Sequence, residues 1–415
     1  MPALIGVQLF LLLIAHVLGD FYAAFYGPLV PHLREQLGLS LTMTTVMATA
    51  YVSMSSFMQP VFGALGERYG RRRIMVTGVL CAAVGMSLLT TPGRFHLPHG
   101  GTFTCVLLAL LVGGVGVGMF HPSGAAISGG MAGNRRSSAL AIYMVGGNIG
   151  VMLAPLALPW MIERRPESIL LLAVPGVAAA LVLWMLLTPD APAPAQRPSA
   201  HPLHLWRVLG KVWPIHLDVI LRFTPMNAYF VMLPLYGTLC GYSLVHSGQM
   251  LAFVMLAGAV GMLSGGFLAE RFPGRGVIAF SEFGAGICLV AAPAVHALPL
   301  QLALLFIGGF LVFSVTPQQI ANAQRRVPCD VAAASGIVMG LAYGNAGLLL
   351  IPLGMLGDHF GAAYASERLA LQYVLQLSAT TLFLAAALSL LVKMPEHADA
   401  DAGADRVAAG FSPPA

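Results

Sequence analysis

Long apolar runs, separated by short polar breaks, follow one another along almost the whole chain. A helix needs about 20 apolar residues to cross the ~30 Å hydrocarbon core of a bilayer, and each run has about that length. The pattern therefore predicts twelve membrane-spanning helices, with boundaries good to about four residues. The predicted spans are residues 4–32, 43–66, 74–91, 103–131, 137–161, 168–188, 212–238, 246–269, 276–295, 299–322, 332–357 and 368–392.

One longer polar break divides these helices into two sets of six. Residues 189–210 begin with PDAPAPAQRP, a composition typical of an extended linker. The pattern predicts an N-terminal bundle over residues 1–188, a linker over 189–210 and a C-terminal bundle over 211–393. The remaining residues, 394–415, are rich in Ala, Asp and Pro and are expected to form a disordered tail.

The two halves repeat one another. The sequence GNIG at 147–150, followed by PL at 155–156, returns as GNAG at 344–347, followed by PL at 352–353. Internal repeats of this size in an apolar chain are typical of a two-lobed transporter.

Composition and charge support a membrane protein and set its orientation. Hydrophobic residues make up 58% of the chain and charged residues 9%, against roughly 25% charged in soluble domains. With the amino terminus in the cytoplasm, fifteen of the 21 Lys and Arg residues fall on cytoplasmic segments and five on the other side, and Arg222 lies within a span. The positive-inside rule then places both termini, the linker and the tail in the cytoplasm of a bacterial inner membrane. The basic charge reflects topology, so no nucleic-acid partner is expected.

Several classes of function are excluded by what the sequence lacks. It contains no GxxxxGK[ST] phosphate loop, so any uphill transport must use an ion gradient. The five cysteines are scattered without metal or redox spacing. No nucleophile–base pair or metal-ligand cluster stands out. We therefore expect no enzyme activity, no cofactor and no metal site.

A basic loop follows the second predicted helix. Residues 63–73 read GALGERYGRRR, and residues 266–275 of the other half read GFLAERFPGR. This resembles the loop motif of the major facilitator superfamily, usually Gly-x-Leu-x-Asp-Arg-x-Gly-Arg-Arg, with Glu in place of its Asp. A further copy, GMLGDHFG at 354–361, follows helix eleven. The matching residues are Gly63, Glu67, Arg68, Gly70, Arg71, Glu270, Arg271 and Asp358.

The resemblance implies an all-α membrane protein with twelve transmembrane helices in two pseudo-symmetric six-helix bundles, rocking around a central cavity. It also implies that Glu67, with Arg68 and Arg71, forms a cytoplasmic latch between the lobes that breaks when the transporter opens inward. Membrane anchoring alone would explain the arginines but not the glycines and acid at fixed spacing.

The fifth predicted helix carries small residues four apart. Gly146, Gly150 and Ala154, followed by Pro155, resemble the antiporter motif Gly-x3-Gly-x3-Gly-Pro of exporters in the superfamily, with Ala154 replacing one glycine. Such a face lets a neighbouring helix approach closely, and the proline weakens the helix beyond it. Ordinary helix packing is the alternative. The motif favours export.

A few further motifs resemble the fosmidomycin-resistance-like branch of the superfamily. They are His16-x3-Asp20 in the first helix, His121-Pro122 in a glycine-rich fourth helix, and Asn148 after two glycines in the fifth. The fourth helix lacks the arginine that many drug–proton antiporters carry there. The coupling mechanism of those antiporters therefore cannot be assumed for this protein.

Ionisable side chains inside the membrane are costly and usually mark substrate or ion paths. Asp20 and His16 share one face of the first helix, and Asp218 and Arg222 share one face of the seventh. The resemblance places helices 1, 4, 7 and 10 around the cavity. We expect Asp20, His16 and His121 to couple protons, and Asp218 and Arg222 to bind substrate. The alternatives are a static pair for Asp20, a packing histidine at His121 and a fixed salt bridge between Arg222 and Asp218.

Amides and aromatic rings near the predicted cavity are candidates for binding substrate or for joining helices. Glu282, on a peripheral helix near the cytoplasmic face, is expected to pair with a loop arginine. The further substrate-binding candidates are Tyr22, Tyr26, Asn148, Asn227, Tyr229, Gln318, Gln319 and Asn345.

The sequence thus predicts a proton-coupled secondary transporter that exports a small organic compound, either a drug or an anionic or zwitterionic metabolite. Three potential cations, His16, His121 and Arg222, favour an anionic substrate, whereas the aromatic residues suit a lipophilic drug. The alternatives are an importer or exchanger of an organic acid or sugar, and a non-transporting scaffold or sensor. The expected partners are a small-molecule substrate, protons and the lipid bilayer, and the protein is expected to be monomeric.

Overall fold

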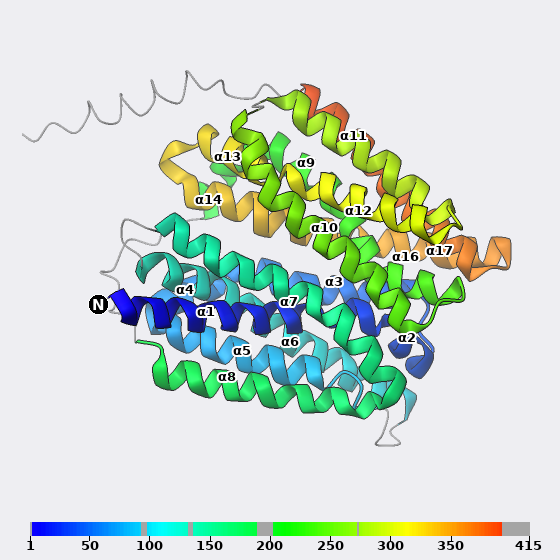
Figure 1. Cartoon of the computed structure of the whole chain (residues 1–415), viewed down its shortest axis with the longest axis horizontal. Coiled ribbons are helices and arrows are strands. Elements are labelled where there is room, and N and C mark those ends of the chain that lie inside the picture. Colours follow the sequence, from blue (N-terminus) through cyan, green and yellow to red (C-terminus); the bar gives the residue numbers. More distant parts are fainter. Residues whose placement is uncertain (1, 93–97, 132–135, 189–201, 272–273, 392–415) are drawn as a thin grey trace, which may run out of the picture.

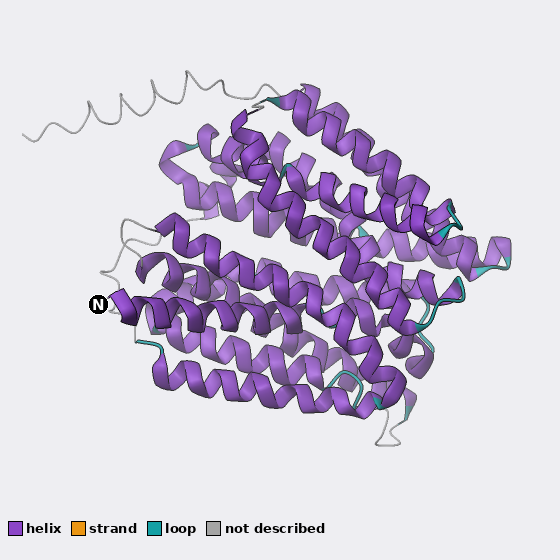
Figure 2. Cartoon of the chain, viewed as in Figure 1, coloured by secondary structure: helices purple, strands orange, loops and turns teal. Residues whose placement is uncertain are grey.

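The computed structural model describes residues 2–92, 98–131, 136–188, 202–271 and 274–391. Within these ranges the chain is helical and contains no strand (Figure 2). The helices run side by side in two lobes (Figure 1). The N-terminal lobe consists of α1 (Pro2–Ala23), α2 (Tyr26–Leu37), α3 (Leu41–Phe57), α4 (Gln59–Tyr69), α5 (Arg71–Ser87), α6 (His99–Met131), α7 (Arg136–Arg164), the short η3 (Pro166–Leu172) and α8 (Ala173–Leu186).

The C-terminal lobe repeats this arrangement. It consists of α9 (Pro202–Leu239), α10 (Leu244–Arg271), α11 (Arg275–Ala291), η4 (Ala292–Ala294), α12 (Leu298–Ser314), α13 (Thr316–Arg326), η5 (Pro328–Asp330), α14 (Val331–Ser335), η6 (Gly336–Leu341), α15 (Ala342–Leu348), α16 (Leu350–Tyr364) and α17 (Glu367–Leu391). The second part of the predicted linker, 202–210, belongs to α9. Its first part and the predicted tail from residue 394 lie outside the described residues.

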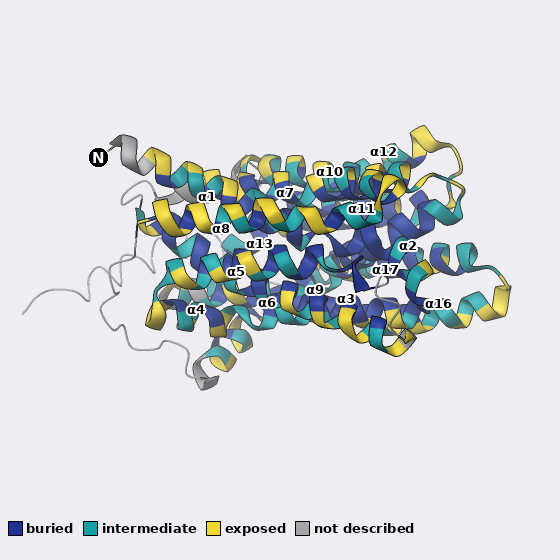
Figure 3. Ribbon diagram, turned by 90° about the horizontal axis from the view of Figure 1, so that it is seen from below, coloured by how far each residue is buried: buried dark blue, intermediate teal, exposed yellow. Residues whose placement is uncertain are grey.

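Twelve spans result from these helices. Among the described residues, nine helical stretches are long and apolar enough to cross a membrane. The stretches α3–α4, α5 and α9 complete the twelve. Large apolar side chains face outward, as a bilayer requires: Met185, Phe267 and Phe280 are each more than 70% exposed. Exposed and buried positions alternate along the outer helices (Figure 3). The predicted all-α, twelve-helix fold is confirmed.

Four of the spans are broken, and each break is followed closely by a proline. The breaks lie between α1 and α2, α3 and α4, α12 and α13, and α15 and α16. The prolines that follow are Pro28, Pro60, Pro317 and Pro352. Proline cannot donate the backbone hydrogen bond that would continue the helix, which explains the position of each break.

The lobes meet along α3 with α15 and α16, and along α7 with α10. We call the end of the bundle where α1 begins the near end, and the end where α2 meets α3 the far end (Figure 1). Close contact between the lobes depends on glycine. A Cβ atom at Gly354 of α16 would lie 2.8 Å from the Leu41 carbonyl oxygen, and one at Gly248 of α10 would lie 2.5 Å from Pro159 Cγ.

Candidate functional site

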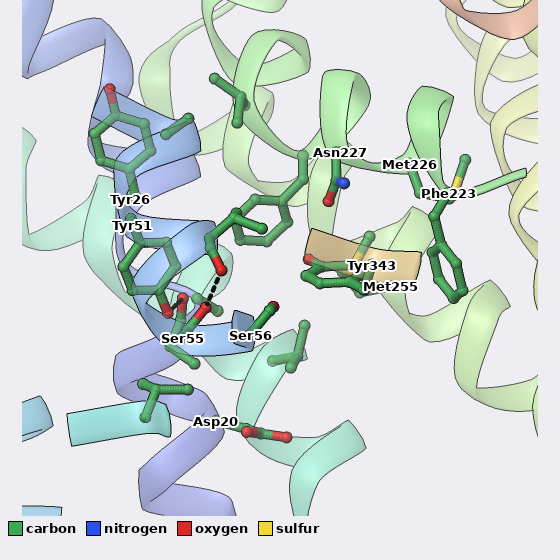
Figure 4. A pocket seen from close by; sticks show the side chains of 18 of the residues that line it. Asp20, Tyr26, Tyr51, Ser55, Ser56, Phe223, Met226, Asn227, Met255 and Tyr343 are labelled. Carbon is green, nitrogen blue, oxygen red and sulfur yellow. Dashed lines mark hydrogen bonds between the residues drawn. The ribbon is translucent and has the colours of Figure 1, made fainter. Parts of the chain in front are cut away.

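A cavity of about 300 Å³ lies between the lobes and takes side chains from both (Figure 4). Its N-terminal wall is mostly polar and is formed by α1, α3, α6 and α7, together with the first residues of α2 and α4. Its C-terminal wall is mostly apolar and aromatic. The polar and ionisable residues that line it are Asp20, Tyr26, Tyr51, Ser55, Ser56, Gln59, His121, Asn148, Asn227 and Tyr343.

Asp20 lies on the N-terminal side of this cavity, between two histidines. Its Oδ2 atom is 3.2 Å from His16 Nε2, and its Oδ1 atom is 3.2 Å from His121 Nε2. The Asp20 side chain is 14% exposed, that of His121 28% and that of His16 3%. The structure therefore brings together all three residues that the sequence singled out for proton coupling. His16 lies behind Asp20, while Asp20 and His121 reach the cavity.

Hydrogen bonding determines which nitrogen of His16 carries a hydrogen. Its Nδ1 atom lies 2.7 Å from the Tyr143 carbonyl oxygen, which can only accept, so Nδ1 donates. Nε2 then faces the Asp20 carboxylate, and two acceptors cannot share a contact without a hydrogen between them. Either the imidazole is doubly protonated beside an ionised Asp20, or Asp20 itself carries the proton. The His16–Asp20 contact thus holds one mobile proton.

Aromatic rings fix the orientation of the buried histidine. The His16 ring stacks on the Tyr143 ring of α7, with 3.9 Å between the ring centroids. The Phe120 ring of α6 has its centroid 5.6 Å from that of His16. The ring nitrogens of His16 and His121 and a carboxylate oxygen of Asp20 lie within 4.8 Å of one another, a spacing at which the three side chains could also hold a metal ion. The expectation that the protein uses no metal or cofactor stays a prediction.

Three of the predicted substrate-binding residues line the cavity, namely Tyr26, Asn148 and Asn227. The Tyr26 hydroxyl is already engaged, because it donates to the Thr44 carbonyl at 2.7 Å. Asn148 follows the glycines of α7 and lies on the N-terminal side. Asn227 faces it from α9. These amides are placed where a substrate could bond to them, and their role stays a prediction.

Other predicted candidates lie within the lobes and do not line the cavity. Tyr22 donates to the Leu172 carbonyl at 2.6 Å, and Tyr229 donates to the Leu289 carbonyl. Gln318 Nε2 donates to the Gly274 carbonyl at 3.1 Å, and Asn345 Nδ2 donates to His216 Nε2 at 3.1 Å. In this conformation these four side chains join helices.

Arg222 differs most from its expected role. Its side chain is buried and does not line the cavity. The Nη1 atom donates to the Val312 carbonyl at 2.8 Å and to Thr316 Oγ1 at 2.9 Å, at the break between α12 and α13. Among the described residues, no carboxylate oxygen, including those of Asp218, forms an ion pair with it. Arg222 therefore caps the last turn of α12, where a cation meets the carbonyl end of a helix.

Asp218 belongs instead to a buried polar cluster with Glu282. Gln319 Nε2 donates to Asp218 Oδ2 and, at 3.1 Å, to Glu282 Oε1. Ser389 Oγ lies 3.1 Å from Asp218 Oδ1 and 2.8 Å from Glu282 Oε2. Glu282 is fully buried inside the C-terminal lobe, so its expected pairing with a loop arginine is wrong. Sequence could not show this, because four separate helices build the cluster.

The loop motif occupies the near end. Glu67 Oε1 lies 3.9 Å from Arg71 Nη2, and both side chains are partly exposed. The chain turns between α4 and α5 at Gly70, whose φ of 100° favours glycine. Gly63 and Arg68 lie on α4 beside them, and Arg271 ends α10. The side chain of Glu270 lies outside the described residues.

Asp358 does not belong with the near-end residues of the loop motif, because it lies at the far end. Its Oδ1 atom accepts from the Leu41 amide at 2.8 Å, and its Oδ2 atom accepts from the Thr42 amide at 2.9 Å and from Thr42 Oγ1 at 2.6 Å. A residue of the C-terminal lobe thus caps helix α3 of the N-terminal lobe. Helix eleven runs from the near to the far end, so its motif copy cannot join the near-end latch.

Several cavity-lining residues carried no signal in the sequence. The C-terminal wall contains Phe223, Met226, Met255, Phe313 and Tyr343. Apolar residues in a membrane helix look alike whether they face lipid, another helix or a cavity. A weak signal existed only for Tyr343, which directly precedes the repeated GNAG sequence.

Comparisons with known proteins agree with this architecture. The family model of the Major Facilitator Superfamily matches residues 12–352. An uncharacterized MFS-type transporter, YfnC of Bacillus subtilis (strain 168), is 26% identical and covers 84% of this chain and 86% of its own length. The fosmidomycin resistance protein of Escherichia coli (strain K12) is 25% identical, covering 83% and 85%.

Solved structures share the fold at low sequence identity. A bacterial homolog of the human lysosomal transporter Spinster, in an inward-facing and occupied conformation, matches with a TM-score of 0.76 at 15% identity, over 93% of this chain and 96% of that one. The nucleoside transporter NupG matches with a TM-score of 0.71 at 12% identity, over 94% and 100%. With a twelve-helix, two-lobed fold and a family match over most of its length, this multi-pass membrane protein belongs to the Major Facilitator Superfamily of transporters, which are not enzymes.

Proposed function

We propose that the protein is a proton-coupled secondary transporter that exports a small organic compound by alternating access. The observation that carries this proposal is the His16–Asp20–His121 cluster on the wall of the cavity between the lobes. An ionisable group within a membrane-spanning helix is costly and usually marks an ion or substrate path, and Asp20 lines the cavity.

Proton exchange requires that Asp20 change partners. In one state the mobile proton lies between His16 Nε2 and Asp20 Oδ2. In the other state the proton has left through the cavity, and Asp20 remains ionised beside His121 and a neutral His16. A substrate that binds next to Asp20 favours the second state. Substrate and proton would therefore bind alternately, which is the requirement for antiport.

The charge distribution supports a near end in the cytoplasm and a bacterial inner membrane as the location. Arg68, Arg71, Arg72 and Arg73 all lie at this end, and cytoplasmic loops carry the excess of basic residues. Bonds between the lobes gather at the far end: Arg34 pairs with Glu367, Asp358 caps α3, and Glu163 accepts from the Val245 amide. This supports a conformation that is closed to the outside.

The lining of the cavity favours neutral or positively charged amphipathic substrates. Among the described lining residues, Asp20 is the one carboxylate, and there is no lysine or arginine. The opposite wall offers Phe223, Met226 and Met255, which suit an apolar or cationic body (Figure 4). The anionic substrate suggested by the sequence depended on His16, His121 and Arg222, and of these three residues His121 alone lines the cavity.

Transport in inverted membrane vesicles tests the function. Asp20→Asn should remove proton-driven accumulation while leaving exchange of internal and external substrate measurable. Ethidium serves as the cationic probe and fosmidomycin as the anionic one, with His246→Gln at the exposed start of α10 as a control. If Asp20→Asn accumulates ethidium with normal pH dependence, the proton site is wrong.

The same vesicles distinguish the alternatives. Uptake into right-side-out rather than inverted vesicles would make the protein an importer or exchanger of an organic acid or sugar. No movement of any probe, with an intact fold, would favour a scaffold or sensor. We propose a monomer because the cavity is complete within one chain.

A further inference from the structure

Three glycines of α7 pack against α1. Two of them face backbone atoms of α1, and the third faces the side chains of His16 and Asp20. A Cβ atom at Gly146 would lie 2.6 Å from the Leu13 carbonyl oxygen, and one at Gly150 would lie 2.8 Å from the Phe21 amide nitrogen. Both positions are limited by the backbone of α1. A Cβ atom at Gly147 would instead overlap Asp20 Oδ2 and lie 2.7 Å from His16 Nε2. Gly147 is thus limited by the proton site itself.

Helix α7 contacts the His16–Asp20 pair at a second point, one turn earlier. The Tyr143 carbonyl accepts the Nδ1 hydrogen of His16, and the Tyr143 ring stacks on the imidazole. Residues four apart lie on one face of a helix, so Tyr143 and Gly147 face the pair together. Tyr143 fixes the ring and its tautomer, and Gly147 leaves the space that the carboxylate occupies.

Gly344, the glycine of the C-terminal lobe that corresponds to Gly147 in the repeat, has different neighbours. Gly344 occupies the position of Gly147 in the GNAG copy, and a Cβ atom there would lie 2.5 Å from Cε1 of the Phe57 ring, across the lobe interface. The repeat alone therefore does not explain why Gly147 faces an ionisable pair.

We propose that Gly147 is a positioning residue for proton coupling, which holds Asp20 against His16 by leaving its side-chain space empty. This inference rests on the proposed proton-coupled function. A methyl group at position 147 must push the carboxylate away from His16 and toward the cavity. Asp20 then loses the contact with His16, whose protonated ring favours the charged carboxylate, and keeps only the contact with His121 on its other oxygen, so it takes up a proton at higher pH.

The test uses Gly147→Ala in the full-length protein in lipid, with Gly344→Ala as the matched control. Infrared spectra with isotope-labelled aspartate follow the carboxyl band of Asp20, identified by its loss in Asp20→Asn. We expect the midpoint of its titration to rise by about one pH unit in Gly147→Ala, a change of about 1.4 kcal/mol, and to stay unchanged in Gly344→Ala. An unchanged midpoint in a folded Gly147→Ala protein would overturn the proposal.

A double variant covers the case in which Gly147→Ala folds poorly. Asp20→Ala removes the group that the new methyl would displace, so the loss of melting temperature should be smaller in the Asp20→Ala background. An equal loss in both backgrounds means that the methyl acts on helix packing, and the proposal fails. The infrared readout needs no transport, so it separates a failure of this inference from a failure of the proposed function.

Discussion

Among the described residues, each lobe buries one histidine in the same setting but with a different partner. His16 of α1 and His216 of α9 both direct Nδ1 at a backbone carbonyl, of Tyr143 at 2.7 Å and of Ile337 at 3.0 Å. The second nitrogen of His16 faces the Asp20 carboxylate, whereas that of His216 accepts from the Asn345 amide. An amide supplies its own hydrogen, and a carboxylate does not.

This difference explains how a duplicated fold can carry an asymmetric function. His216 has both nitrogens satisfied in the neutral form, so its site needs no further proton. At His16 the facing Asp20 carboxylate supplies no hydrogen, so the contact between the two side chains holds an additional proton, and Asp20 lines the cavity. The C-terminal lobe also contains carboxylates, Asp218 and Glu282, but these bond to Gln319 and Ser389 away from the cavity. The cavity thus receives its carboxylate from the N-terminal lobe and its apolar wall from the C-terminal lobe.

The largest effect is expected from removing the buried cation of the C-terminal lobe. Arg222→Met should lower the free energy of unfolding by about 1–3 kcal/mol, because it leaves the buried Val312 carbonyl and Thr316 hydroxyl without their charged donor. Thermal melting of the purified protein in detergent measures this loss of stability. His121→Ala, at a partly exposed position of the N-terminal site, should melt close to the unmodified protein. An Arg222→Met protein that melts normally and loses transport of fosmidomycin alone would restore the substrate role.

An intermediate effect is expected from making the C-terminal site resemble the N-terminal one. Asn345→Asp places a carboxylate beside His216 Nε2, and the new pair should hold one additional proton. Infrared spectra with labelled aspartate should show a new pH-dependent carboxyl band, even in the Asp20→Asn background. Asn345→Gln keeps an amide and is the control. If Asn345→Asp gains no titrating band, the partner at Nε2 is not what separates the two lobes.

The smallest effect is expected at the contact between lobes at the far end. Asp358→Ala removes the cap of α3 and should cost the observed conformation about 0.5–2 kcal/mol, or roughly two- to thirtyfold in the balance between conformations. Distances between spin labels across the far end measure that balance. Glu67→Gln should change it less than about twofold here, since an exposed pair contributes little. If Glu67→Gln shifts the balance between conformations more than Asp358→Ala does, the near end and not the far end is the closed one.

Much of the fold was accessible from the sequence for a simple physical reason. A bilayer demands about 20 apolar residues per helix, so hydropathy alone located all twelve spans, and predicted spans such as 368–392 agree closely with helices such as α17 (Glu367–Leu391). His16 and Asp20 were also found from sequence, because charge within an apolar run is conspicuous and a spacing of four joins residues on one helix.

Tertiary structure alone decided what those charged residues contact. Asp218 and Arg222 have the same spacing as His16 and Asp20, yet they turn to different helices. Arg222 bonds to α12 and α13, and Asp218 bonds to α13 and α17. Likewise, the copies of the loop motif in α4 and in α16 look alike, but α4 runs toward the near end and α16 toward the far end. Local spacing determines which residues can meet on one helix, whereas helix direction and packing between helices determine which of them do.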